Sequence, residues 1–260
     1  GDLLSFVMGN APEGAAWART WAGIMHGWRT RFNAFIKDLK PDCLYSAGNV
    51  TARREYSGPF DWRSGDWFSP NNHRLQQSVS MRRHTVLGLP CDAYTCDTVF
   101  VHSRPRLRPR TKTLSRMLQE GAGVLANGGL WGYWTYPMPD GAFVPSRMRR
   151  ARAAAAFARE RAAVCLGTGS ARWTAVLETD PYALTGSNPP VVGAAKALIH
   201  CHRSPDILDE GDLASAIPYE LIVVPEQSIP DDGKTVGRLE RFAENGGWII
   251  GSGAAIRSPG

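Results

Sequence analysis

The sequence lacks a long apolar run. A membrane-spanning helix needs about 18 or more consecutive apolar residues, and no stretch of the 260 residues reaches that length. The first thirty residues also lack the basic flank and apolar core of a secretion signal. We therefore expect a soluble, cytoplasmic protein that has no membrane partner.

Cysteine is scarce, with five residues that are odd in number and irregularly spaced. A chain of this length can build a core without disulfides, so reduced thiols are expected. Cys201 lies between His200 and His202, but successive helical positions diverge too far for the three side chains to share one metal ion. The sequence therefore predicts no metal site and no cofactor.

Lysine is rare, with 5 Lys beside 25 Arg in a chain of net charge +6. A basic surface can bind nucleic acid through its phosphates. The arginine excess is explained more simply by genomic base composition, so we expect no nucleic-acid partner. The basic residues gather in two clusters, which are Arg104, Arg106, Arg108, Arg110 and Lys112, and then Arg147, Arg149, Arg150 and Arg152.

Aromatic and apolar residues recur at spacings of three and four over residues 15–39, which predicts a long amphipathic helix. Its tryptophans could form a platform for a sugar, but their helical phase favours packing into a core. The residues on this face are Trp17, Trp21, Ile24, Trp28, Phe32, Phe35 and Leu39.

Short strands and helices alternate as far as residue 166, which predicts a parallel sheet with right-handed crossovers. The arginine- and proline-rich segment that follows residue 89 is interpreted as a loop. The predicted strands are 43–46, 60–68, 85–89 and 130–136, and the predicted helices after the first are 72–83, 111–126 and 145–165.

A second unit begins near residue 168, with shorter, aliphatic strands typical of a doubly wound sheet. Its predicted strands are 174–178, 221–225 and 248–251, and its helices are 191–201 and 234–245. Neither unit contains enough strands to be complete. We therefore expect an α/β fragment of a longer protein, in which 1–167 is the C-terminal half of a (β/α)₈ TIM barrel and 168–260 an incomplete flavodoxin-like domain.

Three strings resemble glycoside hydrolases of family 42 and their relatives, including the family 151 α-L-fucosidases and uncharacterised hydrolases. MLQEGAGVLANGGLWGYWTYPMPDG, residues 117–141, resembles their last barrel helix and eighth strand. FDWRSGDWF, residues 60–68, resembles the sixth strand, and residues 219–255 resemble the middle of the β-galactosidase trimerisation domain. The resemblance implies a carbohydrate substrate and a homo-oligomer formed through the second domain when the protein is full length.

Glycoside hydrolysis requires two carboxyl groups about 5 to 10 Å apart, placed at the carboxyl ends of the barrel strands. Asp66 is the best-placed candidate, at the position where relatives carry Glu. Asp92 and Asp97 follow the predicted seventh-strand equivalent and are alternatives for the second carboxylate. Each of these residues could instead be a turn residue, since Asp97 before Thr98 is suited to a local Asx turn. The acid/base of the family 42 enzymes belongs to their fourth strand, which lies before residue 1.

Sugar recognition combines aromatic faces with polar groups that bind hydroxyls. Alternation along the strand allows only one of Tyr133 and Trp134 to line the barrel interior. The candidate substrate-binding residues are Asn49, Trp67, Tyr94, His102, Tyr133 and Trp134.

These observations predict a glycosidase fragment that hydrolyses O-glycosidic bonds in its full-length form. The alternative is a catalytically inactive carbohydrate-binding or assembly protein on the same fold. The second unit resembles class I glutamine amidotransferases in outline, but GSGAA from Gly251 lacks the nucleophilic cysteine. Amidotransferase activity is therefore excluded.

Overall fold

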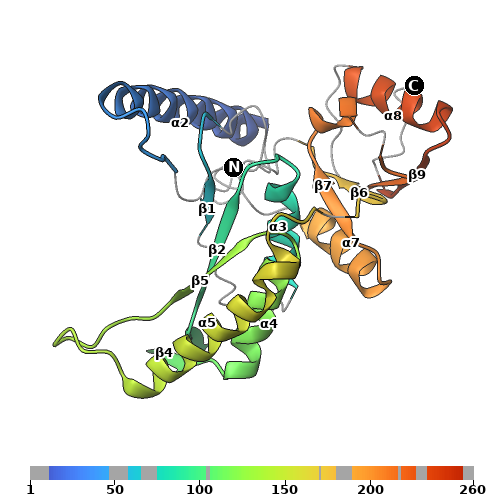
Figure 1. The fold of residues 1–260 in the computed structure, drawn as a ribbon. Coiled ribbons are helices and arrows are strands. Elements are labelled where there is room, and N and C mark those ends of the chain that lie inside the picture. Colours follow the sequence, from blue (N-terminus) through green and yellow to red (C-terminus); the bar gives the residue numbers. More distant parts are fainter. Residues whose placement is uncertain are drawn as a thin grey trace. The chain divides into compact units, whose positions relative to one another are not determined.

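The computed structural model describes residues 12–46, 58–65, 75–103, 106–169, 171–179, 189–215, 218–226 and 233–253 (Figure 1). The chain divides into two compact units, one of residues 62–169 and the other of residues 1–61 with 170–260. Parallel sheets alternate with helices, so the predicted α/β class is confirmed. The division at residue 168 stays a prediction.

The unit of residues 62–169 contains a three-stranded parallel sheet. Its strands β1 (Arg63–Gly65), β2 (Cys91–Cys96) and β5 (Leu130–Trp134) lie in the order β1-β2-β5. The helices of this unit are α3 (Gln76–Thr85), α4 (Leu114–Leu125) and α5 (Pro145–Cys165). α4 begins where Thr113 accepts a hydrogen bond from the backbone N–H of Arg116, which is the usual role of an N-cap threonine.

The strand predicted at residues 85–89 is wrong, because β2 begins at Cys91. The backbone N–H groups of Leu87 and Gly88 donate to the carbonyls of His84 and Thr85, so this segment forms the turn that ends α3. Gly88 has φ +75°, a conformation that favours glycine. The apolar string TVLGL therefore serves a helix end and not a strand.

Two other predicted strands differ from the structure. Residues 43–46 form no strand, and among the described residues 60–65 of the predicted strand 60–68, β1 begins at Arg63. The loop predicted after residue 89 contains an antiparallel hairpin of β3 (Thr98–Ser103) and β4 (Arg106–Thr111). The pattern was missed because proline, present here as Pro109, is disfavoured within strands.

One face of β2 packs against helices. Cys91 and Ala93 form a buried cluster with Met81 of α3 and Val124 of α4, and Trp131 of β5 packs against this cluster. Alternate residues of a strand point to opposite faces. Asp92, Tyr94 and Cys96 therefore belong to the other face of the sheet.

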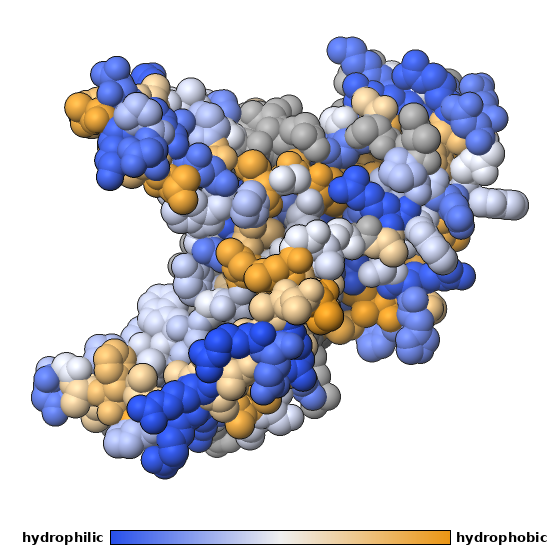
Figure 2. All heavy atoms as spheres, viewed as in Figure 1, coloured by the Kyte–Doolittle hydropathy of each residue, from blue (hydrophilic) through white to orange (hydrophobic). Residues whose placement is uncertain are grey.

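The predicted first helix is present as α2 (Pro12–Leu39), but its aromatic face is not a core. Trp17, Trp21 and Trp28 are 45%, 53% and 50% exposed, and apolar residues of α2 are visible among hydrophilic ones in Figure 2. Core packing of these tryptophans is therefore a wrong prediction. A small cluster of Ile36, Tyr45 and Phe60 forms beside α2.

The second sheet has four parallel strands in the order β7-β6-β8-β9. The strand β7 was not predicted, because a strand that starts at proline and carries an aspartate has little strand character in its sequence. The strands are β6 (Thr174–Leu177), β7 (Pro205–Leu208), β8 (Leu221–Val224) and β9 (Trp248–Gly251), and the helices are α7 (Pro189–His200), η2 (Asp212–Ser215) and α8 (Lys234–Glu244).

Candidate functional site

The carboxyl ends of β1, β2 and β5 meet at one edge of their parallel sheet, which is where α/β folds place their sites. Asp66 and Trp67 follow Gly65, the last residue of β1, but both lie outside the described residues, as does Asn49. His102 lies in β3, in register with Leu107 of β4. The described candidates at the edge itself are Asp97, Tyr133 and Trp134.

Asp97 directly follows β2 and is fully buried. Its backbone N–H donates to the carbonyl of Trp134 at 3.0 Å, and its carbonyl accepts the N–H of Lys112 at 2.7 Å. Its carboxylate Oδ2 accepts hydrogen bonds from Thr135 Oγ1 at 2.8 Å and from Tyr133 Oη at 3.4 Å. Asp97 therefore joins the end of β2 to the end of β5 and to the segment that precedes α4.

A positive charge completes this arrangement. Arg147 of α5 lies with Nε 3.5 Å from Asp97 Oδ2. Burial raises the pKa of Tyr133 to about 12, and the negative charge of Asp97 adds to the effect. The hydroxyl of Tyr133 therefore stays protonated at neutral pH and donates to the carboxylate. We name Asp97, Tyr133, Thr135 and Arg147 the Asp97 clamp.

Asp92 lies within β2, whereas the sequence placed it after the strand. The correction follows from the shift of β2 to Cys91–Cys96. Tyr94 Oη donates to Asp92 Oδ2 at 3.4 Å. Asp92 Oδ1 is buried and accepts no hydrogen bond from the part of the chain that the structure describes. The Tyr94 ring lies against Gly132 of β5, where a Cβ atom would collide with it.

Asp92 and Asp97 cannot form a catalytic pair with each other. They lie five residues apart, which is about 16 Å along an extended strand. They also occupy opposite faces, since Asp97 bonds to Tyr133 and to Arg147 of α5 while Asp92 lies beside Tyr94. The separation exceeds the roughly 5 to 10 Å that glycoside hydrolysis requires.

Tyr133 and Trp134 lie on opposite faces of β5. Tyr133 is in register with Thr95, and Trp134 with Cys96. Trp134 also contacts Tyr136, with ring centroids 5.3 Å apart. The aromatic surface at the carboxyl edge therefore consists of Trp134 and Tyr136, with Tyr94 further along the same face.

Two other aspartates have local roles. Asp61 accepts a hydrogen bond from Lys37 Nζ at 2.9 Å and another from the backbone N–H of Tyr45 at 2.6 Å. The hydrogen bond from Lys37 is the main cause that lowers the pKa of Asp61. Asp140 accepts the N–H of Ala142 in an exposed turn.

Sequence reasoning missed the charged residues beneath the hairpin. Lys112 Nζ lies 2.7 Å from Glu120 Oε2, and both side chains are almost fully buried. Arg116 Nε lies 3.2 Å from Glu120 Oε1. Because Lys112 is buried and paired with Glu120, we no longer count it in the basic cluster named from the sequence. The spacing of Arg116 and Glu120, four residues apart on a helix, was the available signal.

No group of three or more potential metal ligands lies together among the described residues. No helix in the described ranges is long and apolar enough to cross a membrane.

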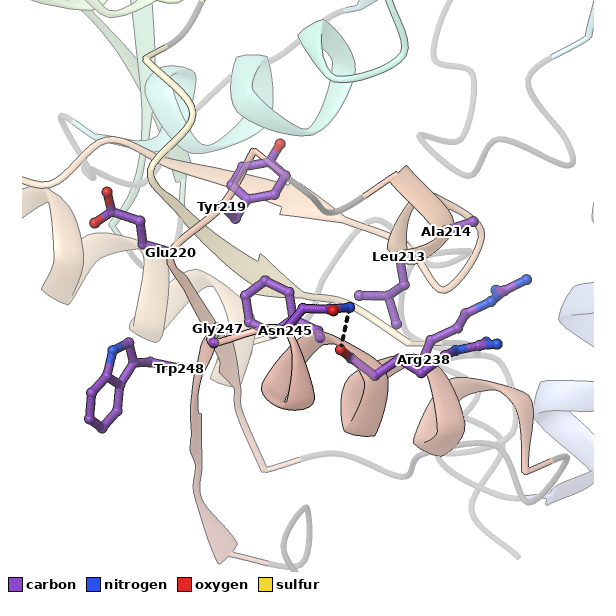
Figure 3. A pocket seen from close by; sticks show the side chains of 11 residues that line it. Leu213, Ala214, Tyr219, Glu220, Arg238, Asn245, Gly247 and Trp248 are labelled. Carbon is purple, nitrogen blue, oxygen red and sulfur yellow. Dashed lines mark hydrogen bonds between the residues drawn. The ribbon is translucent and has the colours of Figure 1, made fainter.

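A cavity of about 1000 Å³ lies in the other unit, beside α8 (Figure 3). Glu220 precedes β8, and Gly247 and Trp248 lie where β9 begins, so this cavity is at the amino ends of the strands. Doubly wound sheets bind ligands at the carboxyl ends. The cavity is lined by Leu213, Ala214, Tyr219, Glu220, Arg238, Arg241, Phe242, Asn245, Gly246, Gly247 and Trp248.

The fold is of the α/β class. The chain is similar to the structure of α-L-fucosidase isoenzyme 2 from Paenibacillus thiaminolyticus, with a TM-score of 0.67 and 18% sequence identity. The match covers 88% of this chain and 35% of the fucosidase. The chain thus spans about a third of that protein's length. No protein-family profile matches the sequence, and no curated protein matches it.

Proposed function

We propose that this chain is part of a glycoside hydrolase that cleaves O-glycosidic bonds in its full-length form. The observation that carries the proposal is the similarity in fold to an α-L-fucosidase over 88% of the chain. The three-stranded parallel sheet β1-β2-β5, with its helices, supports the assignment to half of a TIM barrel. The order β7-β6-β8-β9 supports the flavodoxin-like assignment, because such sheets have the order 2-1-3-4-5.

Asp66 is our candidate for a catalytic carboxylate. It is the first residue after β1, and residues that directly follow barrel strands reach the substrate site. Asp97 is a weaker candidate than the sequence suggested, because its buried carboxylate already accepts hydrogen bonds from Thr135 and Tyr133. A carboxylate that must attack or protonate a sugar needs access to it. We assign Asp97 to holding the strand ends in place.

The sugar is proposed to stack on the aromatic residues at the same edge. Trp134 and Tyr136 form a tilted pair there, and aromatic faces bind the apolar C–H surfaces of sugars. Trp67, Asn49 and His102 complete the proposed contacts. A homo-oligomer formed through residues 168–260 stays a prediction.

The test is hydrolysis of a panel of 4-nitrophenyl glycosides, α-L-fucoside included, by the natural full-length protein. We expect turnover of at least one glycoside. Asp66→Asn should lower kcat by about 10² or more, since a catalytic carboxylate that loses its charge cannot act as base or nucleophile. Wild-type rates in a folded Asp66→Asn protein would show that Asp66 is not a catalytic residue.

The second candidate function is carbohydrate binding without catalysis. The burial of Asp97 and the position of Asp92 favour it, because these two candidates do not form a pair at the required separation. Thermal stabilisation by a sugar that the full-length protein does not hydrolyse would support this alternative.

A further inference from the structure

The cavity beside α8 lies at the amino ends of β8 and β9 (Figure 3). Its volume of about 1000 Å³ is at the upper end of the range for ligand pockets, which is about 300 to 1,000 Å³. Doubly wound sheets bind their usual ligands at the carboxyl ends of the strands, so the topology of the sheet assigns no ligand to this cavity. The class of ligand must therefore be inferred from the side chains that line it.

Hydrogen bonds to other segments of the unit hold two of the lining side chains. Tyr219 Oη donates to Oδ2 of the buried Asp206 at 2.8 Å, which fixes the position of the Tyr219 ring. Arg238 of α8 donates from Nη1 to the carbonyl of Glu210 at 2.6 Å. The wall of the cavity therefore has a defined shape in the folded chain.

Aromatic side chains line the cavity beside Tyr219. The ring of Phe242 lies against Gly247, where a Cβ atom would collide with it, so glycine at this position makes room for the ring. Trp248 is 75% exposed, although tryptophan is highly buried on average in folded proteins. Exposed aromatic faces are suited to stacking on the apolar C–H faces of sugars.

Two side chains of opposite charge also line the cavity. Glu220 and Arg241 are both exposed, and within the described part of the chain neither side chain forms an ion pair or a hydrogen bond. A negatively charged ligand would be repelled by Glu220, and a positively charged ligand by Arg241. Since a carboxylate accepts hydrogen bonds and a guanidinium donates them, the two groups favour a neutral ligand with many hydroxyl groups.

The lining residues extend from Glu220 and Trp248 on one side to Arg238 on the other in Figure 3. A chain of sugars fits such a site, because its rings have apolar faces for aromatic side chains and hydroxyls for polar ones. We propose that the cavity beside α8 is a second carbohydrate-binding site, which holds a neutral oligosaccharide. The inference goes beyond the proposed hydrolysis, because the cavity and the carboxyl edge of β1, β2 and β5 are built from different segments of the chain.

The experiment follows Trp248 by ¹⁹F NMR in the natural full-length protein labelled with 5-fluorotryptophan. The resonance is assigned through Trp248→Phe. The probes are maltotriose, cellotriose and 2′-fucosyllactose, with trigalacturonate as the charged counterpart. We expect at least one of the neutral trisaccharides to shift the Trp248 resonance to saturation. The resonance of Trp21, which is 53% exposed on α2, should stay unshifted.

Glu220→Gln tests the carboxylate that the proposal uses. Glutamine keeps the length of the side chain and removes its charge, so we expect the trisaccharide to bind about tenfold more weakly at the Trp248 resonance. The matched control is Glu240→Gln, which makes the same change at an exposed position of α8 outside the lining of the cavity. The control should bind as the wild type does. An equal loss in both variants would show an effect of overall charge and overturn the proposal.

Three other results would also overturn it. Binding of trigalacturonate without binding of a neutral trisaccharide would assign the cavity to an anionic ligand. A Trp248 resonance that moves with protein concentration in the absence of sugar would assign the cavity to a second copy of the chain. A Trp248 resonance that no neutral trisaccharide shifts at about 10 mM would leave the cavity without a sugar.

Turnover of aryl glycosides by the same protein tests the proposed hydrolysis separately, since the Trp248 resonance reports only on its own surroundings. Turnover without a shift of Trp248 would overturn the second site alone. A saturable shift without turnover would support the second site and remove hydrolysis.

Discussion

Arg147 forms an ion pair with the buried carboxylate of Asp97, with Nε 3.5 Å from Oδ2. The two residues lie at the end of β2 and near the start of α5, so the pair connects elements that are far apart in the sequence. The Arg147 side chain is 22% exposed and that of Asp97 is 0% exposed. Such a pair fixes the position of α5 against the sheet, and its loss leaves an uncompensated charge.

Asp97→Asn should destabilise the protein by about 2 to 3 kcal/mol. Asparagine keeps the shape of aspartate but removes the charge, and breaking a buried pair costs about 3 to 5 kcal/mol. We expect a smaller cost than for a fully buried pair, because the Arg147 side chain is partly exposed to water. Urea denaturation measures the change in the free energy of unfolding.

The control is Asp140→Asn, because the carboxylate of Asp140 accepts a local hydrogen bond from the backbone N–H of Ala142 in an exposed turn. We expect its effect to stay within about 0.5 kcal/mol. Equal effects of the two substitutions would show that the Asp97 clamp contributes nothing specific to stability.

Tyr133 should make stability fall at high pH. Its pKa is raised to about 12 in the folded state, first by burial and then by the charge of Asp97, whereas an unfolded tyrosine has a pKa near 10. The folded state then retains a proton that the unfolded state loses, so this contribution is lost as pH rises from about 10 to about 12.

Tyr133→Phe should show a smaller loss of stability over that range, which urea denaturation at several pH values measures. Tyr136→Phe, at a tyrosine that is 39% exposed, is the matched control. The same pH dependence in wild type and Tyr133→Phe would exclude a shifted titration at Tyr133.

The helices could be predicted because a helix depends mainly on residues that are close together in the sequence. The predicted helix at 15–39 corresponds to α2, and that at 145–165 to α5. The prediction of a strand at 85–89 was wrong because the composition of this segment is typical of a strand, whereas its backbone hydrogen bonds form the end of a helix. Amino-acid composition indicates which residues favour a strand. It does not show which backbone N–H and C=O groups already form hydrogen bonds at a helix end.

The site was less predictable than the fold. Sequence reasoning selected Asp97 but could not foresee that Tyr133, Thr135 and Arg147 bind it, because these partners come from distant segments. A shift of β2 to Cys91–Cys96 also moved Asp92 from after the strand into it. Small errors in strand bounds therefore change which side chains lie at the carboxyl end of a strand.

Two glycines in helices should respond to alanine with opposite signs. A Cβ atom at Gly121 of α4 would collide with the ring of Trp131, whereas none of the described atoms lies within 4 Å of a Cβ at Gly237 of α8. We expect Gly121→Ala to cost about 1 to 3 kcal/mol through overpacking. Gly237→Ala should stabilise by up to about 1 kcal/mol, because alanine favours a helix.

Urea denaturation of both variants tests this pair, and each variant serves as the control for the other. A stabilising Gly121→Ala would mean that Trp131 moves aside without cost.

The buried pair of Lys112 and Glu120 should show strong coupling in a double-mutant cycle. The side chains are 2% and 3% exposed and lie 2.7 Å apart. Lys112→Met leaves Glu120 with Arg116 as its one charged partner among the described residues, and Glu120→Leu leaves the ammonium group buried without its carboxylate. Each single substitution should cost about 3 to 5 kcal/mol. The double substitution should cost much less than the sum, since it removes both charges from the interior.

The control pair is Lys40 and Asp42, which lie 3.9 Å apart with side chains 68% and 80% exposed. Exposed pairs contribute little, so Lys40→Met, Asp42→Leu and their combination should reveal a coupling below about 0.5 kcal/mol. Urea denaturation supplies all the free energies. Additive effects at Lys112 and Glu120 would show that the pair does not act as a unit, and the hairpin base would then depend on the backbone hydrogen bond between Lys112 and Asp97 instead.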